Sequence, residues 1–208
     1  MNKHLIRAVS AAAALTALGA PMLANAESNV QNGTGALTAT ARLDFRVTVP
    51  KVLFLQVGTG TSMGTNATVN LIDFTVPAAN AGDGTAIGAS AASGDLGNGT
   101  VTAKVLGNNG NVTLTSTTVG ALGNGAGDTL SYAQIATTPA VLTSATPLAA
   151  PALADGATTS TTVPAVGKIV NRDAKWTFSF LNTALVAPGV YGGVNANNSR
   201  VTYTASMP

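Results

Sequence analysis

The chain has no cysteine, a single histidine and few charged residues among its 208 positions. Without cysteine it can form no disulfide and offers no thiolate nucleophile or metal ligand. The one histidine is His4, so residues 27–208 also lack the imidazole on which serine triads, most zinc sites and haem ligation depend. These absences argue against most catalytic classes.

The first 26 residues have the three-part pattern of a secretory signal. Lys3 and Arg7 form a short basic start, residues 8–23 are largely apolar, and small residues occupy the cleavage positions in Ala24-Asn25-Ala26. Polar residues, glycine and proline interrupt the apolar stretch, which is too short for a membrane-spanning helix of about 20 residues. We therefore expect residues 1–26 to be a signal peptide, the chain to be exported, and no later segment to insert stably in a membrane.

Cleavage of this segment changes the charge of the chain. The whole sequence has 10 Lys and Arg against 8 Asp and Glu, a formal net charge of +2. Both surplus cations lie within residues 1–26, so residues 27–208 are formally neutral. A neutral chain without a Lys/Arg cluster has no field that would draw it to nucleic acid.

Residues 27–208 are rich in Thr, Val, Ala, Gly and Asn. Thr and Val favour extended backbone, whereas Gly and Asn favour turns. We predict an all-β fold in which residues 50–208 form one sandwich domain. Within it, the Ala/Thr/Ser/Pro-rich stretch 136–166 lacks periodicity and is predicted to be a long surface excursion with at most one edge strand.

The clearest periodic signal runs from Leu37 to Val49. Every odd position in these thirteen residues is apolar and every even position is polar, as in a strand with one buried face. At about 3.3 Å per residue the segment would extend roughly 43 Å, longer than one sheet of a small domain needs. The excess indicates that residues 27–49, an N-terminal extension with the first strand, serve something besides their own domain.

Short apolar or alternating runs predict the other strands. They lie at 52–57, 69–76, 101–106, 112–115, 130–135, 176–181 and 200–207. The sequence Gly107-Asn108-Asn109-Gly110 is a turn signal, so the strands on either side of it are predicted to form a hairpin.

The acidic residues are too scattered to indicate a catalytic pair. They are Glu27, Asp44, Asp73, Asp83, Asp95, Asp128, Asp155 and Asp173. Several stand beside glycine, which favours a role in turns. No calcium-loop spacing and no phosphate-binding loop occurs, and we expect no metal, no cofactor and no enzymatic activity.

The aromatic side chains could fill a core or form a carbohydrate-binding platform. Trp176, Phe178 and Phe180 share one face of a predicted strand. Because the chain has few other bulky residues, the sequence favours the core.

Three features of the sequence occur together. The alternating segment Leu37–Val49 runs into Val52–Val57, and the middle of the chain has short Thr-rich strands such as Asn111–Thr115. The third feature is Pro188-Gly189-Val190-Tyr191, followed by a terminal strand at Val201–Met207. In these features the chain resembles the cysteine-free, alpha-type subunits of chaperone–usher fimbriae and the related spore coat protein U-like secreted proteins.

The resemblance implies an immunoglobulin-like β-sandwich that lacks one strand and is completed by a strand donated from a neighbouring copy. The donor residues that it implies are Leu37, Ala39, Ala41, Leu43 and Phe45, with Thr38, Thr40 and Arg42 facing outward. On the accepting terminal strand it implies Val201, Tyr203 and Ala205. The implied partners are further copies of the chain in a homopolymer, a periplasmic chaperone and an outer-membrane usher.

The favoured function is therefore a structural subunit of a pilus or fimbria at the bacterial surface, built by donor-strand complementation. The alternative is a monomeric secreted adhesin or carbohydrate-binding sandwich, in which the segment 37–49 pairs within its own domain. An enzyme acting through carboxylates ranks last.

Overall fold

The computed structural model describes residues 28–208, and the predicted signal peptide lies outside this range. The chain divides into an N-terminal unit that ends at Val49 and a domain from Pro50 to Pro208. In the N-terminal unit, residues 28–49 form no strand and all their side chains are exposed. The segment 37–49 therefore has no partner strand among residues 28–208.

The domain is built from short strands and two single turns of 3-10 helix. Its strands are β1 (Leu53–Val57), β2 (Ile87–Gly88), β3 (Thr100–Gly107), β4 (Val112–Thr117), β5 (Leu122–Gly123), β6 (Thr129–Leu130), β7 (Ile135–Ala140), β8 (Thr158–Val163), β9 (Val170–Phe180) and β10 (Thr202–Ser206). The turns are η1 (Ala78–Asn80) and η2 (Tyr132–Gln134). The predicted all-β fold is confirmed.

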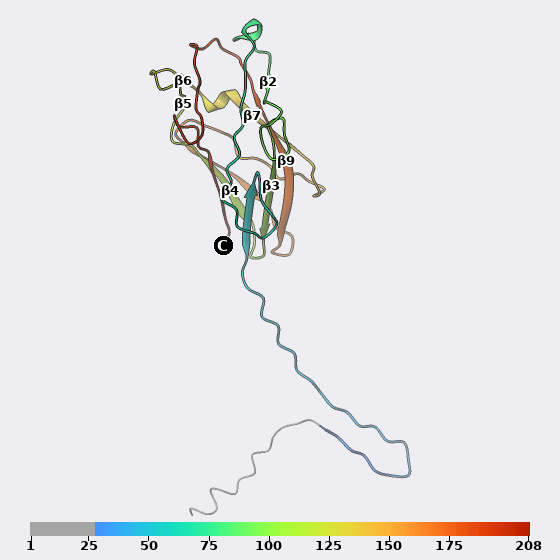
Figure 1. The fold of residues 1–208 in the computed structure, drawn as a ribbon. Helices are drawn as coiled ribbons and strands as arrows, with labels where there is room; N and C mark the ends of the chain where they lie inside the picture. The colour runs from blue at the N-terminus through green and yellow to red at the C-terminus, as the bar shows by residue number, and fades with distance from the viewer. Residues whose placement is uncertain (1–27) are drawn as a thin grey trace, which may run out of the picture. The chain divides into compact units, whose positions relative to one another are not determined.

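Two antiparallel sheets form the domain. In the larger sheet β1 pairs with β3 and β3 with β9, while β2 and β7 also pair with β9. The smaller sheet has the order β10-β4-β8, and β5 and β6 form a separate two-stranded ribbon. In Figure 1 β4 lies on one side of the domain and β3 and β9 lie on the other.

The core lies between the two sheets. Alternate residues of β3 and β9, such as Val105 and Trp176, pack against Val112 and Leu114 of β4. Trp176, Phe178 and Phe180 are all buried, so the preference for core over an exposed aromatic platform is confirmed.

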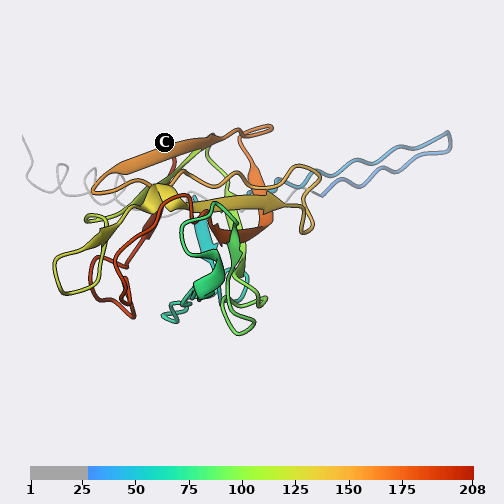
Figure 2. The same cartoon turned by 90° about the horizontal axis from the view of Figure 1, so that it is seen from above.

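A connecting segment, residues 141–157, joins β7 to β8, and we call it the strap (Figure 2). Its Leu148 is buried, and the Leu148 carbonyl accepts a hydrogen bond from the Trp176 indole, with Nε1 and O 2.7 Å apart. The prediction of a surface excursion at 136–166 was therefore wrong in two ways. The stretch includes most of β7 and all of β8, and the strap between them supplies core residues.

The predicted hairpin around residues 107–110 is also wrong. The turn exists, but β3 belongs to the larger sheet and β4 to the smaller one, so the two strands do not pair with each other. The segment 69–76, predicted as a strand, is no regular strand either, although its Ile72 and Phe74 pack against the core. Of the predicted strand 130–135, only its two ends have strand pairing, because η2 lies between them.

Candidate functional site

The smaller sheet ends at β10, which pairs with β4 alone. The larger sheet ends at β1, which pairs with β3 alone. These two edge strands lie on the same side of the sandwich and contact each other. We call this side the β1/β10 edge.

Side chains on β10 that point inward are only half-buried. Tyr203 and Ala205 stand opposite Ser116 and Leu114 in the register with β4. Leu114 is 0% exposed and Ser116 1%, whereas their partners on β10 keep contact with solvent. A strand that borders a packed core but has a neighbour on only one side produces this pattern.

The first strand, β1, forms the other half of the β1/β10 edge. Beyond β1, the Gly58 amide donates to the Thr102 carbonyl and the Thr59 amide donates to Asn70 Oδ1 at 2.7 Å. The loop 60–69 therefore begins and ends beside the end of β1. In the segment after this loop, the half-buried side chains of Ile72 and Phe74 pack on the core.

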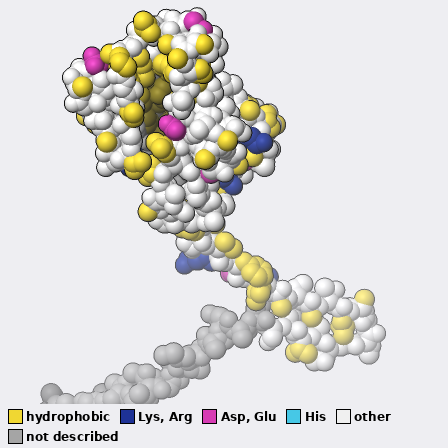
Figure 3. All heavy atoms as spheres, turned by 45° about the horizontal axis from the view of Figure 1, so that its top comes forward, with side chains coloured by type: hydrophobic (Ala, Val, Ile, Leu, Met, Phe, Trp, Pro, Cys, Tyr) yellow, Lys and Arg dark blue, Asp and Glu magenta, His cyan; other side chains and the backbone are white. Residues whose placement is uncertain are grey.

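The domain is visibly hollowed on its surface. Figure 3 shows a depression whose walls carry hydrophobic side chains. Leu55 and Val57 of β1, with Met207 beyond β10, join Tyr203 and Ala205 among the hydrophobic residues that pack against the core yet stay partly exposed.

One end of the β1/β10 edge is tied by polar contacts. Lys51 Nζ and Asn109 Nδ2 both donate to the Pro208 carbonyl, the latter at 2.6 Å. Asn108 links the start of the first strand to the same turn, because its Oδ1 accepts from the Val52 amide at 2.8 Å. The end of β10 and the start of β1 are thus held beside one turn.

Tyr203 is the largest side chain of β10. Its ring lies 5.4 Å from the Trp176 ring, centroid to centroid, at an angle of 48°. Burial raises the pKa of the Tyr203 phenol above its usual range, and the neighbouring Tyr132 adds to the shift. Tyr203 therefore joins the exposed edge to the buried centre of the core.

The residues implied by the resemblance fall into two groups. Tyr203 and Ala205 lie on β10 and Val201 lies just before it, and all three are half-buried. The proposed donor residues are all exposed in the N-terminal unit; Leu43 is 76% and Phe45 85% exposed. The structure thus gathers the terminal-strand residues at one edge and leaves the donor residues without partners among the described strands.

Sequence reasoning missed several residues of this edge. Met207 continues the alternation of 201–207, and that signal was sufficient to find it. No local signal indicated that Leu55, Ile72 and Phe74 border the same opening, because this depends on which strands lie at the sheet ends.

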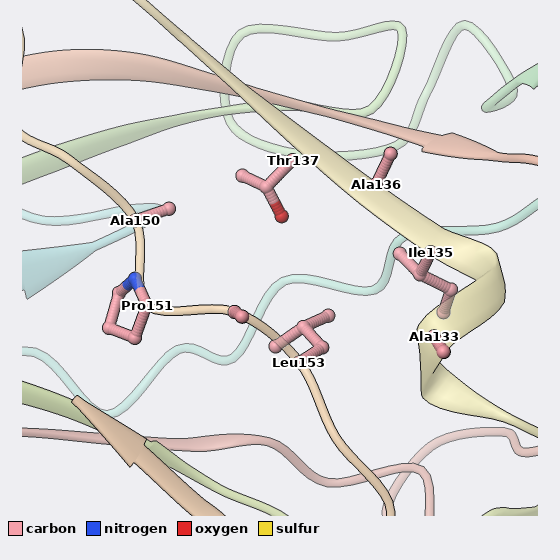
Figure 4. Close-up of a pocket in the computed structure, with 8 residues that line it drawn as sticks. Ala133, Ile135, Ala136, Thr137, Ala150, Pro151 and Leu153 are labelled. Atoms are coloured by element: carbon pink, nitrogen blue, oxygen red, sulfur yellow. The ribbon is translucent and has the colours of Figure 1, made fainter. Parts of the chain in front are cut away.

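A second opening lies on the opposite side of the sandwich. It has a volume of about 420 Å³ and lies between β7 and part of the strap (Figure 4). Its lining residues are Ala133, Ile135, Ala136, Thr137, Ala150, Pro151, Ala152 and Leu153. None of these side chains is ionisable, so the opening offers no acid, base or metal ligand.

Several of the aspartates accept hydrogen bonds from backbone amides. Asp83 Oδ1 accepts from the Thr85 amide at 2.7 Å, which is the turn role that the sequence suggested. Asp173 instead lies within β9 and accepts from the amides of Thr143 and Ser144 in the strap. Burial alone would raise the pKa of Asp173, but these bonds and the Thr143 hydroxyl lower it to about 2.

Residues 28–208 lack two further features. No three His, Cys, Asp or Glu side chains lie close enough together to hold a metal ion. No helix in this part of the chain is long and apolar enough to cross a membrane.

Comparison with known proteins gave no relative: no family model, no curated protein and no solved structure matches the chain.

Proposed function

We propose that this chain is a structural subunit of a surface fibre and that the N-terminal segment of one copy adds a strand to the β1/β10 edge of the next. The observation that carries the proposal is the half-buried inward row of β10 beside a fully buried row on β4. At this edge the core has room for one more covering strand, and none of the described strands lies there.

The N-terminal unit has the pattern that such a strand needs. Its apolar residues stand at every second position from Leu37 to Val49 and are exposed. Inserted beside β10, this apolar row would face the core while Thr38 and Thr40 face outward. Burying a leucine or phenylalanine side chain contributes about 1.5–3 kcal/mol, and the free backbone groups of β10 would gain partners.

Assembly in this way requires the edge to be protected before subunits meet. An exposed, uncharged sheet edge invites unspecific pairing. We therefore include in the proposal an exported chain, a periplasmic chaperone that occupies the edge in transit, and an outer-membrane usher at which the strand is exchanged. With the donated strand in place, the domain would be a complete immunoglobulin-like sandwich.

Matched substitutions on the two faces of each segment test the proposal. Leu43→Asp puts a charge on the apolar face of the donor segment, and Thr40→Asp puts the same charge on its polar face. Likewise Ala205→Arg blocks the inward face of β10, and Thr204→Arg changes its outward face. Negative-stain microscopy of the purified protein should show fibres for the wild type, Thr40→Asp and Thr204→Arg, and none for Leu43→Asp and Ala205→Arg.

A mixing experiment separates donor from acceptor. The Leu43→Asp protein can accept a strand but cannot donate one, and the Ala205→Arg protein can donate but cannot accept. Mixed together, they should form a one-to-one complex in analytical ultracentrifugation, although each alone stays monomeric. The proposal would be refuted if a variant that lacks residues 27–43 still formed fibres. It would also be refuted if the wild type stayed monomeric and bound a glycan, and that result would favour the adhesin.

A further inference from the structure

The outer face of the smaller sheet consists entirely of serine and threonine. The outward residues of β4 are Thr113, Thr115 and Thr117; those of β8 are Thr158, Ser160 and Thr162; those of β10 are Thr202, Thr204 and Ser206. We call these nine residues the Ser/Thr face. Seven of them are exposed, and Thr115 and Thr117 on the central strand are half-buried.

Strand pairing places these residues in three rows. Thr115 stands opposite Thr204 on one side and Ser160 on the other, and the rows before and after it are equally complete. Sheet geometry sets the spacing of the hydroxyls at about 4.8 Å between strands and about 6.8 Å along each strand. The result is a regular two-dimensional array.

The array is stiff, and most of its hydroxyls are free. Seven of the nine residues are threonine, whose branched side chain has few rotamers. Within the array, Thr117 and Thr158 share a hydrogen bond of 2.8 Å and the Thr115 hydroxyl donates to the Thr204 carbonyl at 3.3 Å. The other hydroxyls have no hydrogen-bond partner within the described residues, so they are available to water or a ligand.

The chemistry of the face excludes several kinds of ligand. It has no lysine or arginine for phosphate and no aromatic ring on which a sugar could stack. It is a sheet surface, and the two openings described above lie elsewhere, so it does not enclose a small molecule. An apolar protein surface would bury hydroxyls that have no partner within the domain, which is costly.

We propose that the Ser/Thr face binds ice. The surface of an ice crystal is itself a regular array of water molecules that both donate and accept hydrogen bonds. Each free hydroxyl would keep a water partner on contact, and the threonine methyl groups would fit between lattice waters without charge to disturb them. Adjacent strands are rotated by about 20–25°, so the face is nearly planar only around its centre at Thr115. We therefore expect crystal shaping with a small gap between the melting and freezing temperatures.

The outer face of the larger sheet serves as an internal control. It has Lys104 on β3 and Lys175 on β9, and its threonines form no such array. Thr138, on the edge strand β7 of that sheet, is exposed and on its outer face. The same substitution can therefore be compared on the two sheets.

The test measures this temperature gap and the crystal habit for the purified full-length chain. The wild type should give faceted crystals and a measurable gap. Thr115→Lys should abolish both, and Ser160→Lys, at an exposed position on the edge strand β8, should reduce them. Thr138→Lys should keep the wild-type values. Circular dichroism melts would show that each variant is folded.

Several results would overturn the proposal. They are round crystals with no gap for the wild type, unchanged values in both Thr115→Lys and Ser160→Lys, or an equal loss in Thr138→Lys. A wild type that does not shape ice but dissociates from dimer to monomer on Thr115→Lys would make the face a contact between copies instead. The Leu43→Asp variant should shape ice as the wild type does, so this proposal and the fibre proposal can fail separately.

Discussion

The two long edges of the sandwich are closed in different ways. At the β7/β8 edge the strap covers the core with buried Leu148, and its Ala152 carbonyl accepts a hydrogen bond from Ser116 Oγ at 2.8 Å. At the β1/β10 edge no segment of the domain, residues 50–208, does the same, and the inward side chains stay half-buried. The chain thus completes one edge with its own residues, whereas the other is the edge at which we propose that a second copy adds a strand.

The largest difference between the edges should appear when a leucine is truncated at the closed one. Leu148→Ala should lower the free energy of unfolding by about 2–5 kcal/mol, because it leaves a cavity beside Trp176. Urea unfolding followed by the fluorescence of Trp176, the sole tryptophan, measures it directly. Leu185→Ala, at a leucine that is 76% exposed, is the control and should cost almost nothing. Equal losses in the two variants would show that the strap is not part of the core.

Acid should loosen the closed edge through Asp173. Its pKa is about 2 in the folded protein against an ordinary value of 3.8, so its stabilising effect is complete above about pH 4 and disappears as the pH falls towards 2. The shift corresponds to at most about 2.5 kcal/mol. Unfolding free energies of the wild type and Asp173→Asn should differ most above pH 4 and converge near pH 2. Thr143→Val, which removes only the hydroxyl donor, should lie between them; a constant difference across this range would contradict the assignment.

The open edge should tolerate the same leucine truncation better. Leu55 on β1 is half-buried, so Leu55→Ala should cost the isolated domain about 1–2 kcal/mol, less than Leu148→Ala. Leu71→Ala, at an exposed leucine in the segment that follows the loop 60–69, is the matched control and should be nearly neutral. If a donated strand covers this edge, the loss at Leu55 should be larger in assembled fibres than in monomers. A monomer loss equal to that of Leu148→Ala would mean that the edge is already closed.

The smallest effects should come from the hydroxyl groups of two tyrosines beside the core, Tyr132 and Tyr203. The Tyr132 hydroxyl donates to the Asn198 carbonyl at 2.8 Å, so Tyr132→Phe should cost about 0.5–1.5 kcal/mol. The Tyr203 hydroxyl has no partner among residues 28–208, and Tyr203→Phe should be close to neutral.

Burial, with a contribution from Asp155, raises the pKa of Tyr132 to about 12, so the neutral phenol is favoured in the folded state. Stability from this source is complete below pH 10 and is lost as the pH rises towards 12. Unfolding measured between pH 9 and 12 should therefore be less pH-dependent in Tyr132→Phe than in the wild type. An unchanged pH dependence would show that this phenol ionises as easily in the folded chain as in the unfolded one.

Alternation in the sequence located most strands but not their partners. The turn at 107–110 was found from its glycines and asparagines, yet a turn reverses the chain whether the next strand stays in the same sheet or crosses to the other. Both β3 and β4 have one buried face, so either pairing fits the local sequence. The sequence did not predict the Ser/Thr face for the same reason, because the face forms only when β4, β8 and β10 pair in register.

The strap was wrongly predicted to be a surface excursion because the residues that hold it in place lie far from it in the sequence. Leu148 is an isolated apolar residue in a stretch without periodicity, and the carboxylate that orders the start of the strap, Asp173, follows thirty positions after Thr143. The terminal strand was easier, because Val201, Tyr203 and Ala205 alternate with polar residues and all three prove half-buried. The alternation at 37–49 is complete over thirteen residues, but no strand among residues 28–208 pairs with it.

The junction of Thr59 with Asn70 has a practical consequence. The Thr59 amide and hydroxyl bond the Asn70 side chain, and glycine is favoured at position 58, where φ is 88° and a Cβ would displace the Asn70 side chain. The loop between them begins and ends at one fixed point, and doubling the length of such a loop costs only about 0.6 kcal/mol. A foreign peptide inserted near Gly64 should therefore be displayed without disturbing either sheet, and a polymer of this chain would present it once per subunit.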